Sequence, residues 1–106
     1  MTGGDHVSVL ISAKFTVDVV RFRSALVSHR EYFLKFGEVG RSMGRAHHRV
    51  GIGDGFILVL DEWDTVPHFH DFYAAPELKD YIREIGSSTV PSAVTIAEAI
   101  ASPSDH

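Results

Sequence analysis

The feature that most constrains the fold is a run of five consecutive apolar residues that begins at Phe56 and ends at Leu60. In a strand, successive side chains point to opposite faces of the sheet. Phe56, Leu58 and Leu60 would therefore lie on one face, and the two residues between them on the other. Because a strand that is apolar on both faces needs cover on both, the sheet that contains this run must be covered on each side.

The patterns around this run predict a series of strands and helices. Alternating apolar residues predict a strand at Val7–Phe15. An apolar stripe with spacings of three and four predicts one continuous helix that follows Asp18, reaches Phe36 and ends at Gly37. The other expected elements are a loop at Glu38–Gly44, strands at Arg45–Val50, Phe56–Trp63 and Ala93–Ile100, a short helix with Pro67 in its first turn, and a helix at Pro76–Ile85.

The order of these elements, β-α-β-β-α-α-β, is that of the ferredoxin-like split βαβ plan. It predicts an α+β fold in which helices cover one face of a single antiparallel sheet. The simplest cover for the other face is the sheet of an identical subunit. We therefore expect a homodimeric α/β barrel in which residues 1–106 form one domain, with residues 1–6 and 102–106 as flexible ends.

Charge and composition exclude several classes of partner. The formal net charge is −4 and the basic residues form no block, which argues against binding to nucleic acid or to an anionic membrane. The absence of cysteine excludes disulfides, thiolate metal sites and a cysteine nucleophile. No apolar run is long enough to span a bilayer, and the N-terminal residues lack the features of a signal peptide, so we expect a cytoplasmic protein.

A family resemblance lies in the segment that follows the apolar run. The sequence Glu62-Trp63-Asp64-Thr65, followed by Phe69 and by Phe72–Leu78, resembles the dimeric α/β barrel superfamily. The closest likeness is to small actinobacterial members described as antibiotic biosynthesis monooxygenase-like or cyclase-like. The resemblance covers most of residues 7–100 as a pattern and implies a small-molecule pocket in each protomer. It specifies the fold better than the activity, because this fold hosts many chemistries.

The active-site residues of these relatives are only partly present. The quinone-forming monooxygenases combine the tryptophan with an asparagine four residues earlier and a tyrosine six residues later, where this chain has Val59 and Phe69. The haem-degrading relatives have a histidine nine or ten residues after the tryptophan, where this chain has Phe72 and Tyr73. At the positions of the cyclase histidine and tyrosine, the chain has Leu78 and Phe72. None of the three sites is intact.

His29 is the first candidate for acid–base chemistry, since histidine transfers protons near neutral pH. It is the only polar member of the helical stripe and is expected to face the sheet among Leu26, Phe33 and Phe36. One interpretation is a general base in the pocket. The other is a core histidine whose ring is satisfied by a hydrogen bond.

His48 is the second candidate. His47 and His48 are adjacent on an expected strand, so they should point to opposite faces. Regular alternation puts Arg45 and Arg49 on the face of His47, and Val50 on the face of His48. Because its neighbour on this face is apolar, the side chain of His48 is expected to point toward hydrophobic surroundings. We expect His48 or Arg45 to orient a carbonyl or phenolate, with a purely structural role as the alternative.

Aromatic residues supply the expected substrate-binding wall. Trp63 would stack on a flat ligand, with Tyr32 and Tyr73 as phenol donors and Phe33 beside them. The alternative for Trp63 is core packing or a contact between subunits. Tyr32 and Tyr73 would then be residues at the boundary of the core.

The sequence predicts no metal and no cofactor. It has no histidine pair or histidine–carboxylate cluster at helical spacing, although a site built from distant segments, such as His29 with His48, stays open. Gly37, Gly40 and Gly44 follow a helix rather than a strand, so they do not fit a dinucleotide-binding motif; they are expected to give loop flexibility at the mouth of a pocket, or simply to form turns.

The leading hypothesis is a cofactor-independent enzyme, like a monooxygenase or a cyclase, that acts on a flat aromatic or polyketide-like compound. In it His29 acts as acid or base, Trp63 stacks on the substrate, and His48 or Arg45 orients its oxygen. The first alternative is a non-catalytic dimeric protein that binds a small hydrophobic or aromatic molecule. The second is a protein that binds or degrades haem through one of its histidines.

Overall fold

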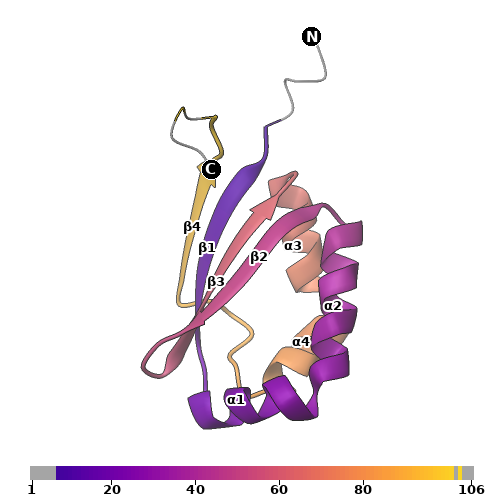
Figure 1. Cartoon of the computed structure of the whole chain (residues 1–106), viewed down its shortest axis with the longest axis vertical. Helices are drawn as coiled ribbons and strands as arrows, with labels where there is room; N and C mark the ends of the chain where they lie inside the picture. Colours follow the sequence, from indigo (N-terminus) through magenta and orange to yellow (C-terminus); the bar gives the residue numbers. More distant parts are fainter. Residues whose placement is uncertain (1–6, 102, 104–106) are drawn as a thin grey trace.

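The computed structural model describes residues 7–101 and 103, so the expected flexible ends lie almost entirely outside the described residues. These residues form four strands and four helices, which follow one another in the order β-α-α-β-β-α-α-β (Figure 1). Their bounds are β1 (Val9–Thr16), α1 (Val19–Ser28), α2 (Arg30–Ser42), β2 (Arg45–Ile52), β3 (Phe56–Trp63), α3 (Val66–Ala74), α4 (Pro76–Glu84) and β4 (Ala93–Glu98).

The strands form one antiparallel sheet in the order β2-β3-β1-β4, which confirms the predicted ferredoxin-like α+β fold. β1 and β3 occupy the two interior positions, and their pairing runs from Val9 opposite Trp63 to Thr16 opposite Phe56. The fully apolar run therefore lies in an interior strand, as its composition predicts.

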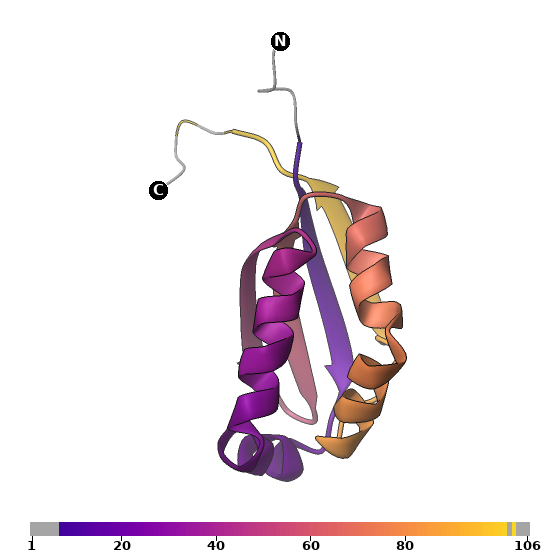
Figure 2. The same cartoon turned by 90° about the vertical axis from the view of Figure 1, so that its right-hand side faces the viewer.

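The helices lie on one face of the sheet (Figure 2). Ile57 and Val59 of β3 point to this face and are buried in the core. On the opposite face, Leu10 and Leu60 are 46% and 47% exposed. A single chain thus covers only one side of β3, whose apolar run has apolar side chains on both faces.

The first helical segment differs from the sequence prediction. The expected single helix breaks at His29, whose backbone angles are φ −116° and ψ 29°, and the second helix continues through Gly37 to Ser42. A straight helix over residues 19–42 would be roughly 36 Å long, whereas an eight-residue strand spans about 26 Å. Because of the break, α1 crosses the end of the sheet while α2 lies along its face (Figure 2).

Of the three glycines expected in a loop or in turns, two lie inside α2. Gly37 and Gly40 are helical, and only Gly44, at φ +116°, needs the freedom of glycine in a turn. At Gly40, an added Cβ would lie 2.7 Å from the guanidinium of Arg45. This glycine is therefore a packing position that lets the Arg45 side chain lie against α2.

Candidate functional site

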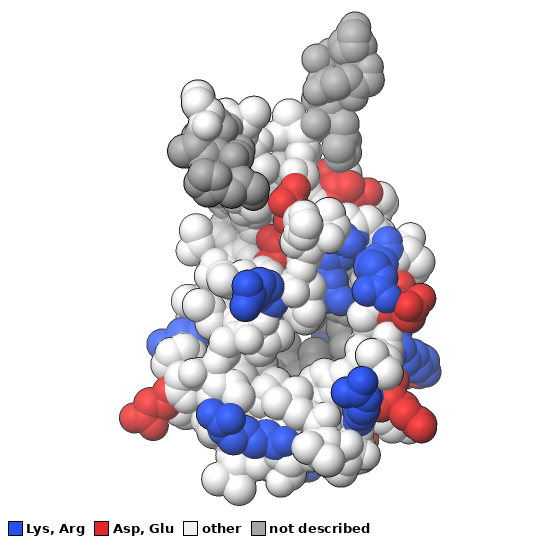
Figure 3. Space-filling model, in the orientation of Figure 1, with Lys and Arg blue, Asp and Glu red and all other residues white. Residues whose placement is uncertain are grey.

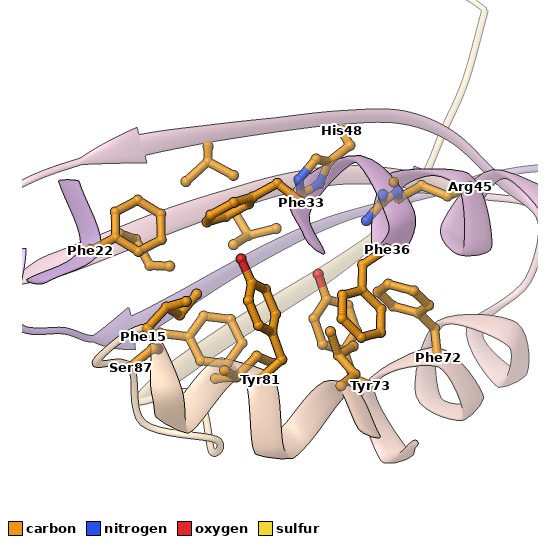
Figure 4. Close-up of a pocket in the computed structure, with 17 residues that line it drawn as sticks. Phe15, Phe22, Phe33, Phe36, Arg45, His48, Phe72, Tyr73, Tyr81 and Ser87 are labelled. Atoms are coloured by element: carbon orange, nitrogen blue, oxygen red, sulfur yellow. The ribbon is translucent and has the colours of Figure 1, made fainter. Parts of the chain in front are cut away.

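A cavity of about 130 Å³ lies between the helices and the sheet (Figure 4). This is close to the size of a ~150 Å³ apolar protein cavity that binds benzene. Its wall is mostly aromatic and aliphatic, with a few polar groups: Phe15, Phe22, Phe33, Phe36, Gly37, Arg45, His48, Val50, Ile57, Val59, Phe72, Tyr73, Leu78, Tyr81, Ile82, Ile85 and Ser87. An apolar cavity with few polar groups is the usual form of a small-molecule site.

The surface of the molecule is hollowed near the gap that Figure 1 draws between β2 and α2, and Lys and Arg side chains lie around this hollow (Figure 3). His48, which lines the cavity, is 37% exposed at its side chain. It therefore contacts both the cavity and solvent, as a group that exchanges protons with water must.

Asp61 organises the polar part of the site. Its side chain is only 1% exposed, and its Oδ1 lies 2.5 Å from Nδ1 of His48. Its Oδ2 accepts hydrogen bonds from Nε1 of Trp63 at 3.1 Å and from the hydroxyl of Tyr73 at 3.3 Å. Because a carboxylate only accepts, Nδ1 of His48 carries the proton and Nε2 is left as the basic nitrogen.

Tyr73 stays protonated in this setting. Burial raises its pKa well above the usual value, and the neighbouring Asp61 adds to the rise, while Arg45 opposes it. The phenol therefore remains a hydrogen-bond donor to Asp61 throughout the neutral range.

A β-bulge places Arg45 on the same face as His48. The pairing of β2 with β3 shifts between Arg45 and His47, so that Arg45 lies opposite Trp63 and His48 opposite Asp61. The prediction that Arg45 shares a face with His47 is therefore wrong, because it assumed regular alternation and the bulge inserts one extra residue. His47 lies on the open face of the sheet.

Arg45 is 7% exposed and packs among aromatic rings. Its guanidinium carbon lies 5.2 Å from the ring centre of Phe72 and 5.9 Å from that of Trp63. Cation–π contacts of this kind strengthen when they are shielded from water. The cavity thus has a buried cation in the same wall as His48 (Figure 4).

Four of the predicted site residues come together in this cavity: Arg45, His48, Phe33 and Tyr73. Trp63 lies outside its wall, because its side chain is fully buried and its indole N–H is bonded to Asp61. The expected stacking surface is thus a core residue that positions the carboxylate.

His29 and Tyr32 also lie outside the cavity wall. His29 occupies the joint between α1 and α2, where Nε2 is 4.0 Å from Oε1 of Glu84. The expectation that it faces the sheet is wrong, because the stripe assumed a helix that does not break. Tyr32 is 47% exposed and stacks on the outer side of Tyr81.

Sequence analysis missed two polar residues of the site, Asp61 and Tyr81. Asp61 has the phase of Ile57 and Val59 along β3, so a carboxylate on a buried face was a visible signal. Tyr81 follows Leu78 by three residues in α4, a spacing that puts both on one helix face.

Two further classes of feature are missing from the described part of the chain. Residues 7–101 and 103 contain no group of three or more histidines, aspartates or glutamates placed to hold a metal ion. None of the helices in that region has the length and apolar character needed to cross a membrane.

Comparison with solved structures finds this fold in proteins of low sequence identity. SnoaB from Streptomyces nogalater, described as a cofactor-independent oxygenase, matches with a TM-score of 0.62 at 16% identity, over 93% of this chain and 99% of that chain. Rv0793 from Mycobacterium tuberculosis matches with a TM-score of 0.57 at 20% identity, over 92% and 99%. A dimeric ferredoxin-like protein from an uncultured marine organism matches with a TM-score of 0.55 at 12% identity, over 92% of each chain.

The chain has the ferredoxin-like fold of these proteins. The predicted resemblance is thereby confirmed at the level of the fold. No protein-family model matches the sequence, and no curated protein matches it.

Proposed function

We propose that this protein is an enzyme that acts on a flat aromatic or polyketide-like compound without a cofactor, in the manner of a monooxygenase or a cyclase. The observation that carries the proposal is the hydrogen bond between buried Asp61 and His48 in the wall of an aromatic cavity. A carboxylate that fixes the tautomer of a histidine is the usual way to prepare a general base.

The first step is a proton transfer. Nε2 of His48 takes a proton from a carbon next to a carbonyl, or from a phenol, and the electron pair moves onto the substrate oxygen. The guanidinium of Arg45, buried in the same wall, stabilises the resulting enolate or phenolate. Ring closure or reaction with O₂ then follows from the reactivity of this anion.

The size of the cavity suits one ring of such a compound. The rest of a larger flat molecule would extend past His48 toward the hollow on the surface (Figure 3). A haem has four pyrrole rings, so haem binding would require the cavity to open much wider, and the geometry favours the smaller aromatic ligand.

The test uses anthrone as a probe substrate, with oxygen uptake and anthraquinone absorbance as readouts. The expected result is turnover by the wild-type protein and its loss in His48→Ala. His47→Ala is the matched control, because it removes the adjacent histidine on the opposite face of the sheet. Equal rates in both variants would refute the role of His48. Anthrone that raises the melting temperature without being converted would favour the non-catalytic binding protein.

We further propose that the protein pairs with a second copy through the open face of the sheet. Leu10 and Leu60 are large apolar residues left half exposed on this face, where they line a shallow depression with His47, Arg49 and Glu62. Each Å² of apolar surface that the pairing removes from water would stabilise the dimer by about 25 cal/mol. One of the structural neighbours is described as a dimer. Sedimentation velocity at micromolar concentration tests the proposal, and a stable single subunit would refute it.

A further inference from the structure

Tyr81 carries a polar group into the apolar part of the cavity. The residue belongs to α4 and is 6% exposed. Within the described residues 7–101 and 103, its hydroxyl is the buried side-chain polar atom that has no hydrogen-bond partner. Figure 4 shows this hydroxyl pointing from α4 toward the sheet, and the hydroxyl of Tyr73 pointing the same way from α3.

Packing explains the ring of Tyr81 but not its hydroxyl. The ring stacks on Phe36 and Tyr32, with centre-to-centre distances of 5.3 and 5.2 Å, and meets Phe33 edge to face at 5.5 Å. A phenylalanine would make the same contacts. A buried hydroxyl without a partner destabilises the fold, so its presence needs another reason.

An ordered water is a poor partner for this hydroxyl. A buried water needs two to four polar partners of its own. The wall next to Tyr81 is formed by apolar side chains such as Phe33, Ile82 and Ile85. The hydroxyl of Ser87, which also lines the cavity, already donates to the carbonyl of Ser88.

The hydroxyl is suited to donating rather than accepting. Burial raises the pKa of Tyr81 above its usual value, and the nearby Glu84 and Tyr32 add to the rise. The group therefore stays neutral and keeps its proton, which it can offer to an acceptor in the cavity.

We propose that Tyr81 determines ligand specificity by donating a hydrogen bond to a ketone or quinone oxygen of the bound molecule. The inference rests on the proposed function, since it assigns one polar substituent of the flat aromatic ligand. A compound without that oxygen would leave the hydroxyl unpaired, and the cavity would discriminate against it.

The experiment compares two rigid, flat probes that differ by one carbonyl group, 1-indanone and indane. Dissociation constants are measured by NMR titration for the wild type, Tyr81→Phe and Tyr32→Phe. We expect Tyr81→Phe to weaken 1-indanone binding about 3- to 10-fold and to leave indane binding unchanged. Tyr32→Phe is the matched control, because it removes a hydroxyl from the same aromatic cluster outside the cavity wall.

An infrared spectrum gives a second readout that a merely structural role would not move. The carbonyl stretch of bound 1-indanone should shift to lower wavenumber in the wild type and in Tyr32→Phe, and the shift should vanish in Tyr81→Phe. An unshifted carbonyl in the wild type would overturn the inference even if Tyr81→Phe did not fold.

The outcomes separate this inference from the proposed function. If both probes bind and Tyr81→Phe affects them equally, the hydroxyl does not select the ligand, and only the inference on Tyr81 fails. If neither probe binds the wild type, the cavity is not an aromatic site, and the proposed function fails together with the inference.

Discussion

Replacing Asp61 by asparagine tests whether the carboxylate fixes the tautomer of His48. Oδ2 of Asp61 accepts from two donors, Trp63 and Tyr73, whereas Oδ1 faces His48 alone. Asparagine keeps the shape of the side chain but replaces one oxygen by an NH₂ group that only donates. Because the indole N–H of Trp63 cannot accept, the amide oxygen must take the position of Oδ2, and the NH₂ group then faces His48.

The imidazole must respond by moving its proton. Nδ1 of His48 becomes an acceptor for the amide, so the proton passes to Nε2, the nitrogen that acts as base in the proposed mechanism. An acid–base group contributes roughly 10²- to 10⁴-fold to a rate, and the wrong tautomer removes that contribution. We therefore expect Asp61→Asn to lower turnover by about this factor.

The fold should survive the substitution. Two hydrogen bonds to a charged acceptor, from Trp63 and Tyr73, become bonds to a neutral one, and the bond with His48 becomes a neutral bond that the amide donates; each falls from about 1.5–3 kcal/mol to about 0.5–1.5 kcal/mol. Part of this loss is offset because a neutral amide is less costly to bury than a carboxylate. We expect a net loss of about 1–3 kcal/mol of unfolding free energy, below the 5–15 kcal/mol that is typical of a whole domain.

The assay needs no substrate. Long-range ¹⁵N–¹H correlation spectra distinguish a protonated ring nitrogen from a bare one, so they report the tautomer of each histidine. The expected result is Nδ1–H for His48 in the wild type and Nε2–H in Asp61→Asn. His47, on the other face of the sheet, is the internal control. A wild-type His48 that is already protonated at Nε2, or that does not respond to the substitution, would refute the reasoning.

Three further predictions test the packing, the assembly and the protonation of Tyr73. Gly37→Ala should raise the unfolding free energy by about 0.5–1 kcal/mol, because nothing lies within 4 Å of the added Cβ. Gly40→Ala should fail to give this gain in urea unfolding, because its Cβ meets the Arg45 guanidinium at 2.7 Å; equal gains would contradict the packing argument. Leu60→Glu should convert a dimer into monomers in sedimentation velocity without unfolding the chain, since Leu60 is 47% exposed in the single subunit. Because the pKa of Tyr73 is raised in the folded state from an ordinary value of 10.0, its contribution to stability is present below pH 10 and is lost as the pH rises further. Urea unfolding between pH 9 and 11.5 should therefore show a fall of up to about 1.4 kcal/mol per pH unit from this group, and Tyr73→Phe should show a shallower fall.

Much of the fold follows from local patterns in the sequence. The apolar run in β3 predicted that the chain's own helices leave one apolar face of this strand uncovered, and Leu10 and Leu60 lie on that face of the sheet. The starts of two helices also have a local signal: Asp18 accepts a hydrogen bond from the backbone of Arg21, and Thr65 accepts one from the backbone of His68, and both residue types are preferred at helix N-termini. These features depend on residues close together in the chain, which is why a sequence can predict them.

The break between α1 and α2 at His29 could not be predicted from local sequence patterns. The stripe of apolar residues continues through it without interruption, and the next glycine, Gly37, lies inside α2. A single straight helix over residues 19–42 would be longer than the strands beneath it, so a helical segment of this length fits along the sheet only with a break. This is a tertiary constraint, and it also moves His29 away from the cavity wall.

The composition of the site depends on one inserted residue in β2. In a regular strand, residues three apart point to opposite faces, so Arg45 and His48 would be separated by the sheet. The extra residue before His47 reverses this relation and brings Arg45 and His48 into one cavity wall, while His47 and Arg49 lie on the open face. Because the bulge lies next to the pair formed by Arg45 and Trp63 at the end of β3, both strands can pair normally beyond it. The bulge therefore places Arg45 and His48 in the cavity wall and leaves His47 and Arg49 on the open face, through which we propose that a second copy pairs.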